Sequence, residues 1–470
     1  MVGGGVIGLT LAYHLALAGE EVCVLDARRT GQGASDVNAG WICPAETAPV
    51  PGPGAVALTL RSMLRPDSPV YVHPSLDPAF LTFMLGLWRR SNARDQRAGF
   101  EAHLRLAADS LDWFDAYRDD GMDFELHRAG LLMAFLQRRN LEHHRSNLDL
   151  VRRFGLQPRV LIGDDVRAHE SALSDAVYGG IFFPRERHVI PGALAAALHR
   201  RLRGLGAGVV EDAPVVAVQL AGGRVRSVRT PEATYDADRF VLAAGAWTGP
   251  LSREFGVPLP VRPGKGYSVD LPPFDLRSPI NLSDAKVAVT PFTNSLRLAG
   301  TMEFAGWDEH VNAVRVRAIM QAPRAYFRNW AEPATVPMGR AGIRPMTPDG
   351  LPVIGRLPGL DNAYVNSGHG MLGVTLAAGS ASALTELMLG AGLPPALRPF
   401  DPARFHSSRF TCTSVRSARK APSWPHAQHS TSAASSLPSR HRSRPMPPGS
   451  TRAPSPHKPT GSSAQESTAS

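Results

Sequence analysis

The sequence is poor in cysteine and has no apolar run long enough to cross a membrane. Its three cysteines, Cys23, Cys43 and Cys412, form no C-x-x-C pair. An odd number of widely spaced cysteines argues against a disulfide framework and for a reducing compartment, and we expect no metal site. Nowhere do about 18 apolar residues follow one another without a charge, so we expect no transmembrane segment.

Positive and negative side chains nearly balance outside the C-terminal end of the chain. The formal charge is +10, but residues 407–470 hold nine Lys or Arg and only one Glu. The first 406 residues therefore carry 42 basic and 40 acidic side chains. The pairs Arg89-Arg90 and Arg152-Arg153 fit solvated helix faces, without the interleaved aromatic residues of a single-strand-binding surface. We expect no nucleic-acid partner for the folded part.

A glycine-rich motif opens the chain, Gly3-Gly4-Gly5-Val6-Ile7-Gly8, and fits G-x-G-x-x-G. Apolar residues at helical spacing follow up to Gly19, then a short apolar strand that ends at Asp26. Such a turn lets backbone N–H groups and a helix N-terminus meet a pyrophosphate, while the carboxylate accepts hydrogen bonds from a ribose. Glycine-rich turns alone are common, but this order of parts predicts a dinucleotide site.

The β-strand that should precede this motif is almost missing. Only Met1 and Val2 come before Gly3. A central parallel strand cannot be omitted at low cost, because its neighbours would lose backbone hydrogen-bond partners. We therefore expect that the start site has been placed too far downstream.

Dinucleotide-type patterns recur at both ends of the chain, with different material between them. Helical patterning dominates residues 81–154, and residues 263–298 are rich in strand patterns. The economical architecture is one cofactor domain with a substrate domain inserted into it. We assign residues 1–48, 188–262 and 339–404 to the cofactor domain and residues 49–187 and 263–338 to the substrate domain. Residues 405–470 form a basic Ser/Pro-rich tail, which we expect to be disordered.

Two segments of small residues suit close contact with a cofactor. Residues 30–40 are small and polar, and residues 243–246, which include Gly245, follow a buried strand. Either segment could present its backbone to a planar group. An ordinary loop and tight helix–sheet packing would select the same residues, so composition leaves both readings open.

Seven segments occur together in one order: GGGVIGL, ASDVNAG, LAAGAWTGPL, KGYS, RLAGTMEF, GIRPMTPDGLPVIG and NSGHGMLGVTLAAGS. With them the chain resembles the flavin-dependent D-amino-acid oxidase family, and most closely its bacterial D-amino-acid dehydrogenase branch, over residues 2–404. The resemblance implies non-covalent FAD. It also implies an α/β fold, α+β overall, in which a Rossmann-like FAD-binding domain carries an inserted substrate domain built on a large antiparallel sheet.

The same resemblance implies which residues hold FAD. Asp26 would bind the ribose, where relatives usually have Glu, and Val216 would lie on the adenine side. The pyrophosphate residues would be Gly3, Gly5, Val6, Ile7 and Gly8. The flavin contacts would be Ser35, Ala39, Gly40, Gly368, Gly370, Met371 and Leu372, and Gly245 is a further candidate from its small-residue segment. No Cys near Thr347 is present to tether the flavin.

Arg344 matches the arginine that anchors a substrate carboxylate in several members of the family. A guanidinium offers a planar fork for a carboxylate, and Arg344 lies in a Gly/Pro-rich segment that suits a fixed position. The alternative is a structural arginine that pairs with Asp349. The neighbouring Arg340 departs from the tryptophan that many members have there.

Tyr267 and His369 are further candidates for the catalytic site. Tyr267 could shape the substrate pocket or donate its hydroxyl, but a tyrosine buried in a sheet is as often plain packing. His369 lies between two glycines and could stabilise negative charge on reduced flavin, or it could be satisfied by backbone groups. The sequence leaves both alternatives open.

The predicted function is FAD-dependent oxidation of a D-amino acid, or a related secondary amino acid, to an imino acid that hydrolyses to a 2-oxo acid and ammonia. The electrons would pass to a quinone or another acceptor. The enzyme would be cytoplasmic, free or attached to the inner face of the membrane. The alternatives are an oxygen-using oxidase of the glycine or sarcosine type and a degenerate family member without flavin.

Overall fold

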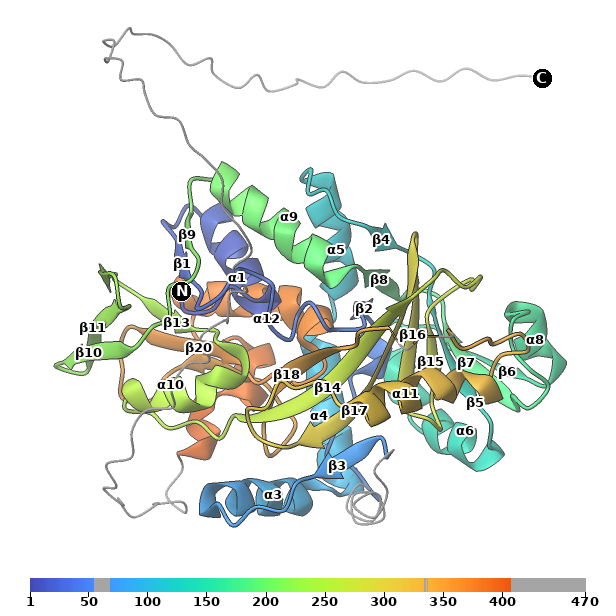
Figure 1. Ribbon diagram of the computed structural model, residues 1–470. Helices are drawn as coiled ribbons and strands as arrows, with labels where there is room; N and C mark the ends of the chain where they lie inside the picture. The colour runs from blue at the N-terminus through green and yellow to red at the C-terminus, as the bar shows by residue number, and fades with distance from the viewer. Residues whose placement is uncertain (55–67, 334, 336, 407–470) are drawn as a thin grey trace, which may run out of the picture. The chain divides into compact units, whose positions relative to one another are not determined.

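Two β-sheets organise the described part of the chain, which comprises residues 1–54, 68–333, 335 and 337–406 of the computed structural model (Figure 1). The smaller sheet is parallel except for its last strand. Its order is β9 (Gly208–Val210), β1 (Cys23–Leu25), Val2, β13 (Phe240–Leu242), β20 (Ala363–Ser367) and β19 (Val353–Arg356). The tail beyond residue 406 lies outside the described residues.

Val2 stands where the central strand of the smaller sheet is needed. It bridges Leu25 on one side and Leu242 on the other, both in parallel. Its N–H donates to the carbonyl of Val241 at 2.8 Å, and its own carbonyl accepts from Ala243 at 2.8 Å. One bridging residue thus joins the two halves of the sheet at the point where the sequence has almost no strand.

Helices cover one face of this sheet and a small antiparallel sheet covers the other. The helices are α1 (Val6–Leu17), α9 (Pro191–Gly204) and α12 (Gly373–Met388). The opposite face carries β10 (Ala217–Ala221), β11 (Arg224–Arg229), β12 (Thr234–Asp236) and α10 (Thr248–Glu254). Buried apolar side chains fill both interfaces. The arrangement is the predicted Rossmann-like domain.

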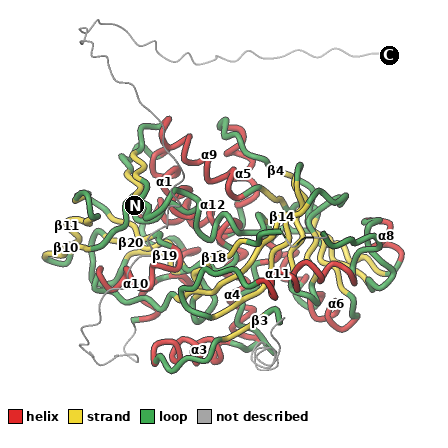
Figure 2. Tube along the Cα trace, viewed as in Figure 1, coloured by secondary structure: helices red, strands yellow, loops and turns green. Residues whose placement is uncertain are grey.

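The larger sheet, whose strands are yellow in Figure 2, has nine strands in the described part of the chain and is mostly antiparallel. Its order is β6 (Arg159–Ile162), β7 (Gly179–Phe183), β5 (Leu131–Phe135), β15 (Ile280–Leu282), β16 (Val287–Phe292), β17 (Ser295–Phe304), β14 (Arg262–Leu271) and β18 (Arg340–Met346), and β3 (Val70–Val72) pairs with β17. Only the β5/β15 and β3/β17 pairs are parallel. The predicted fold class is confirmed.

Two helices of the substrate domain begin at residues whose side chains cap them. Asp77 accepts the N–H of Ala79 at the start of α3 (Pro78–Arg90), and Asn92 accepts that of Asp95 at the start of α4 (Ala93–Leu106). The apolar residues at helical spacing in this region stay buried on both sides of a break between α4 and α5 (Ser110–Asp119). The remaining helices are α6 (Arg138–Arg145), α7 (Leu148–Arg153), α8 (Asp164–His169) and α11 (Ala313–Gln321).

Short elements connect the two sheets. A three-stranded sheet comprises β2 (Trp41–Ile42), β8 (Arg187–Val189) and β4 (Leu126–His127). The 3-10 turns are η1 (Pro44–Glu46), η2 (Gly245–Trp247), η3 (Ala322–Ala325), η4 (Pro395–Phe400) and η5 (Pro402–Phe405). β18 pairs with β14 along its whole length, so the segment assigned to the cofactor domain from residue 339 first contributes a strand to the larger sheet. The other segment boundaries stay predictions.

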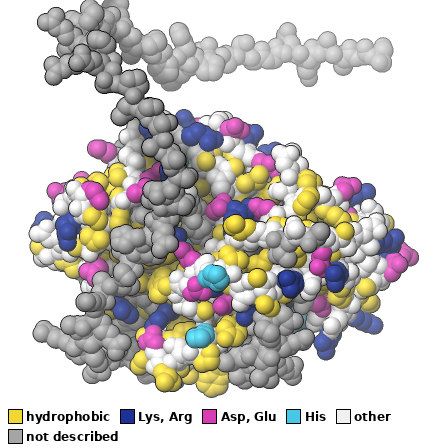
Figure 3. Space-filling view, viewed as in Figure 1, with side chains coloured by type: hydrophobic (Ala, Val, Ile, Leu, Met, Phe, Trp, Pro, Cys, Tyr) yellow, Lys and Arg dark blue, Asp and Glu magenta, His cyan; other side chains and the backbone are white. Residues whose placement is uncertain are grey.

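Charge on the visible surface is mixed. In Figure 3, Lys and Arg side chains are interspersed with Asp and Glu over the face that is shown. None of the helices in the described ranges is both long and apolar enough to cross a bilayer.

Candidate active site

The glycines at the start of α1 allow contacts that no other residue permits. Gly3 has φ of +113°, and a Cβ there would lie 2.4 Å from the carbonyl oxygen of Ala243, which directly follows β13. A Cβ on Gly8 would lie 2.0 Å from the carbonyl oxygen of Gly3. The turn, the helix and the sheet can therefore approach this closely only because Gly3 and Gly8 have no side chain. The close approach directs the N-terminus of α1, through Gly5, Val6 and Ile7, at the loop that contains Ser35.

Asp26 lies directly beside this turn. Its Oδ2 accepts the N–H of Gly4 at 2.5 Å and its Oδ1 accepts the N–H of Arg28 at 2.8 Å. Burial raises the pKa of Asp26, while these two backbone donors act in the opposite direction. The strand end, the turn and the carboxylate thus meet as the spacing predicts, and the role of Asp26 toward a ribose stays a proposal.

The loop formed by residues 30–40 is tied both to α1 and to the larger sheet. The Ser35 hydroxyl accepts the N–H of Val6 at 3.1 Å. Arg297 on β17 donates to the carbonyls of Asp36 and Asn38, each at 2.9 Å. Arg340 pairs with Asp36 at 2.8 Å and with Asp270 at 2.5 Å, so the residue that departs from the family's tryptophan anchors this loop. The loop is therefore a fixed wall rather than a simple connection.

The other predicted flavin contacts lie at two places. Gly370, Met371 and Leu372 precede α12 and face the loop, where Asn38 donates to the carbonyl of Met371 at 3.2 Å. Gly368 and Gly370 both have positive φ, and Gly370 donates to the carbonyl of Pro345. Gly245 begins η2 after β13, and Val216 is half-exposed beyond β9. Neither Gly245 nor Val216 lines the main cavity, and their roles stay predictions.

A cavity of about 440 Å³ separates the loop from the larger sheet. Ala34, Val37, Ala39 and Leu372 line it on the side of the smaller sheet, whereas strands β14 to β18 line the other. Its charged and strongly polar lining residues are Asn38, Glu46, Asn281, Lys286, Thr301, Arg344 and Thr375. Ala39, Gly370, Met371 and Leu372 from the predicted flavin set line this cavity together with Arg344.

Arg344 extends from β18 across the neighbouring strand. Its Nη1 donates to the carbonyl of Thr301 on β17 at 2.6 Å. The guanidinium passes over Gly266 on β14, where an added Cβ would lie 2.0 Å from Nη2. Burial lowers the pKa of Arg344 to about 10, so the side chain stays charged at neutral pH. No ion pair joins it to a carboxylate among the described residues, which leaves its charge available to the cavity.

Thr301 adopts a backbone conformation that is rare for a β-branched residue. Its φ is +67°, and it lies where the pairing of β14 with β17 shifts register between Lys265 and Tyr267. A non-glycine residue at positive φ stores strain that the surrounding structure must impose. Here the irregular ladder turns a strand carbonyl toward Arg344. The segment that contains Thr301 belongs to the family resemblance, but no sequence pattern marks this residue.

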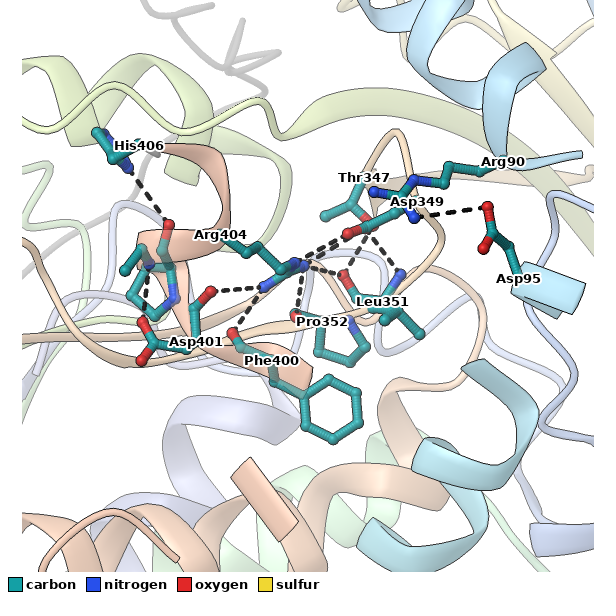
Figure 4. Close-up of polar contacts among 12 residues, drawn as sticks. Arg90, Asp95, Thr347, Asp349, Leu351, Pro352, Phe400, Asp401, Arg404 and His406 are labelled. Atoms are coloured by element: carbon teal, nitrogen blue, oxygen red, sulfur yellow. Dashed lines mark hydrogen bonds and ion pairs between the residues drawn. The ribbon is translucent and has the colours of Figure 1, made fainter. Parts of the chain in front are cut away.

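Asp349 does not pair with Arg344. Figure 4 shows that it pairs with Arg404, at 2.8 Å, and that Arg404 also donates to the carbonyls of Leu351, Pro352 and Phe400. The pairing of Arg344 with Asp349, which the alternative required, is therefore not observed, and Arg404 pairs with Asp349 at η5.

Tyr267 lies on the opposite face of the larger sheet from the cavity. Its side chain is fully buried against α11, and its hydroxyl donates to Glu303 at 2.7 Å. Because side chains alternate along a strand, Gly266 faces the cavity and Tyr267 faces away. Burial and this hydrogen bond raise the pKa of Tyr267. The prediction that Tyr267 contacts substrate is corrected, and its role is packing.

His369 is buried beside the segment before α12. Its Nε2 lies 2.9 Å from the Ser380 hydroxyl, and its Nδ1 has no partner in the described structure. Burial lowers the pKa of His369 to about 3, and the nearby His103 adds to this effect. The ring is thus neutral at physiological pH and offers at most a hydrogen bond, so it cannot supply a positive charge to reduced flavin.

Glu46, Asn281 and Lys286 face the cavity and were not predicted from the sequence. The Asn281 amide donates to Glu46 Oε2 at 2.9 Å. Burial raises the pKa of Glu46 to about 7, while Asn281 and Lys286 act in the opposite direction. Glu46 closes the Pro-rich η1 turn, and no pattern around it distinguishes it from a loop residue. The pairing of β15 with β16 places Lys286 near Asn281, and the hydrogen bond from Asn281 ties Glu46 of η1 to this end of the larger sheet.

Comparison with known proteins identifies the family. The family described as FAD dependent oxidoreductase matches residues 1–387. The chain belongs to that family. A D-amino acid dehydrogenase of Xanthobacter autotrophicus is 33% identical over 413 residues, covering 83% of this chain and 94% of the relative. One of Vibrio cholerae is 31% identical over 397 residues with the same coverage. Glycine oxidase from Geobacillus kaustophilus has a similar fold, with a TM-score of 0.68, 21% identity, and coverage of 86% and 97%.

FAD is the cofactor of this enzyme, and the observed cradle fits it. The turn that only glycine permits, the N-terminus of α1 and Asp26 suit its adenosine diphosphate half, while the cavity between the loop and the larger sheet suits its ring. Cys43 lines the cavity, but burial raises its pKa well above the usual range. It therefore stays a thiol rather than a reactive thiolate, in keeping with our proposal of non-covalent binding.

Proposed function

We propose that this oxidoreductase oxidises the α-carbon–nitrogen bond of a D-amino acid, whose carboxylate Arg344 binds. A charged guanidinium that points into the cofactor cavity without a carboxylate partner among the described residues carries this proposal. The names of the relatives, D-amino acid dehydrogenases at 31–33% identity, support the choice of substrate.

The residues of this chain would act by orientation. Thr301 holds one nitrogen of Arg344, which leaves the remaining donors of the planar fork for a bidentate carboxylate. A fixed carboxylate restricts the direction of the Cα–H bond, and most of the rate gain in such a site comes from this positioning. When bound, FAD accepts the hydrogen and the electrons that leave the substrate. The imino acid then reacts with water to give a 2-oxo acid and ammonia.

We further propose a quinone-type electron acceptor, with the enzyme in the cytoplasm or at the inner face of the membrane. This part rests on the dehydrogenase relatives alone. An oxygen-using oxidase would share the fold and the cavity, so the acceptor needs its own measurement.

Purified FAD-loaded protein should be assayed with a panel of D-amino acids, with an artificial dye, a soluble quinone or dioxygen as acceptor. We expect dye or quinone reduction that exceeds peroxide formation, and a 2-oxo acid in equal amount. The matching L-amino acids serve as the control for stereochemistry. Stoichiometric peroxide would make the protein an oxidase, and activity with amines that lack a carboxylate would refute the proposed substrate.

A further inference from the structure

Glu46 is the only acidic side chain among the described residues that line the cavity. One oxygen, Oε2, is held by Asn281, and no described residue donates to Oε1. A carboxylate in this position needs a partner, because an unpaired charge inside a cavity is costly. The part of the site already described, around Arg344, does not use it.

Glu46 and Arg344 are held at two different strands of the larger sheet that are not neighbours. Arg344 is held over β17 by Thr301, and Glu46 is held at β15 by Asn281, with β16 between them. Two strand spacings correspond to about 10 Å. A substrate's α-amino group shares a carbon with the carboxylate that Arg344 binds. It therefore stays at the Arg344 end, and only the end of a long side chain can reach Glu46.

The path between the two charges suits an aliphatic stem. Ala288 on β16 pairs in register with Asn281 and with Ala299 on β17, and both alanines line the cavity. Met84 and Leu87 of α3 also line it. These small residues leave space over β16 and β17, and the apolar lining favours methylene groups.

Neighbouring charged groups leave Glu46 as the group that ionises first. Glu186 lies beside it, accepts the N–H of Ala45 at 3.1 Å, and is fully buried. Burial raises the pKa of Glu186 to about 8, above that of Glu46. Lys286 lines the cavity with an exposed side chain, and its positive charge favours the ionised form of Glu46, while the Cys43 thiol stays protonated. Glu46 therefore gains its negative charge near neutral pH.

We infer that Glu46 binds a cationic group at the end of the substrate's side chain, which makes basic D-amino acids the preferred substrate class. This inference rests on the proposed D-amino-acid oxidation. It assigns specificity to Glu46 and positioning of the α-carboxylate to Arg344.

The test compares D-arginine with D-citrulline, which differ in charge but hardly in shape. We expect wild-type kcat/KM to favour D-arginine, and Glu46→Gln to lower the ratio of the two values by about tenfold or more. Glu46→Gln keeps the size of the side chain and an oxygen that can accept the hydrogen bond from Asn281. The control is Glu142→Gln, the same change at an exposed residue paired with Arg145 on α6, which should leave the ratio as it is.

The preference should also depend on pH. Glu46 gains its charge as pH rises through its pKa of about 7, while the guanidinium of D-arginine stays charged. The D-arginine to D-citrulline ratio should therefore rise between about pH 6 and about pH 8.5 in the wild type and stay flat in Glu46→Gln.

Calorimetric binding to the dithionite-reduced enzyme separates this inference from the proposed reaction. Glu46-dependent binding of D-arginine without turnover would refute the reaction and support the inference. If both substrates are turned over and the D-arginine to D-citrulline ratio of kcat/KM is the same in wild type and Glu46→Gln, the reaction is supported and the inference is overturned. A preference for D-citrulline would also overturn it.

Discussion

The two walls of the cavity differ in the kinds of groups that line them. The wall on the side of the smaller sheet has no charged side chain among the described lining residues and includes Ala34, Ala39 and Leu372. The wall on the larger sheet carries Arg344, Glu46, Asn281 and Lys286 on strands or turns far apart in the sequence. The first wall suits a cofactor recognised through backbone groups, and the second suits a substrate recognised through charge. Each wall can be disabled separately, and the predictions below use that separation.

The largest effect on FAD content is expected at the cofactor wall from Gly8→Ala. The new Cβ would lie 2.0 Å from the carbonyl oxygen of Gly3, and backbone cannot move aside as a flexible side chain can. We expect FAD content per purified chain to fall by about tenfold or more, or the protein to fail to fold. Gly204→Ala at the end of α9 is the control, because the methyl group added there would have no atom within 4 Å. Full FAD content in Gly8→Ala would contradict the account of the turn.

The cofactor wall was largely predictable from the sequence and the substrate wall was not. Gly3, Gly8 and Asp26 act within one continuous strand–turn–helix unit, so local spacing predicts where they meet. Glu46 on η1 and Asn281 on β15 are 235 residues apart and meet only through the tertiary fold, which leaves no local pattern. Tyr267 was misplaced because the register of β14, which no spacing reveals, decides which of two adjacent residues faces the cavity.

The next effect is expected at the substrate wall from Gly266→Ala. A methyl group would occupy the position of the Arg344 guanidinium, so the arginine must move away from Thr301. We expect kcat/KM for the best D-amino acid to fall by about 10- to 100-fold, since a displaced anchor misaligns the substrate. FAD content should remain. Gly208→Ala on β9 is the strand control, because its Cβ would make only an ordinary 3.4 Å contact with Cys23.

The smallest effect on activity is expected from Arg404→Ala, although this variant should lose stability. Arg404 pairs with Asp349 and donates to several loop carbonyls, but it does not line the cavity. We expect a loss of about 2 kcal/mol or more in unfolding free energy, measured with denaturant at constant FAD. KM for the D-amino acid should change little. A large rise in KM without a loss of stability would mean that the two arginines have exchanged roles.

The most direct test of the central claim is anaerobic mixing of a D-amino acid with FAD-loaded wild type, Arg344→Ala and Arg344→Lys. The loss of flavin absorbance reports substrate oxidation without any acceptor. We predict that Arg344→Ala keeps its FAD but loses about a hundredfold in the second-order rate of bleaching, equivalent to about 3 kcal/mol. Arg344→Lys should recover only part of it, because lysine keeps the charge without the planar fork. Unchanged bleaching in Arg344→Ala, or release of its FAD, would contradict the assignment of Arg344 as the carboxylate anchor.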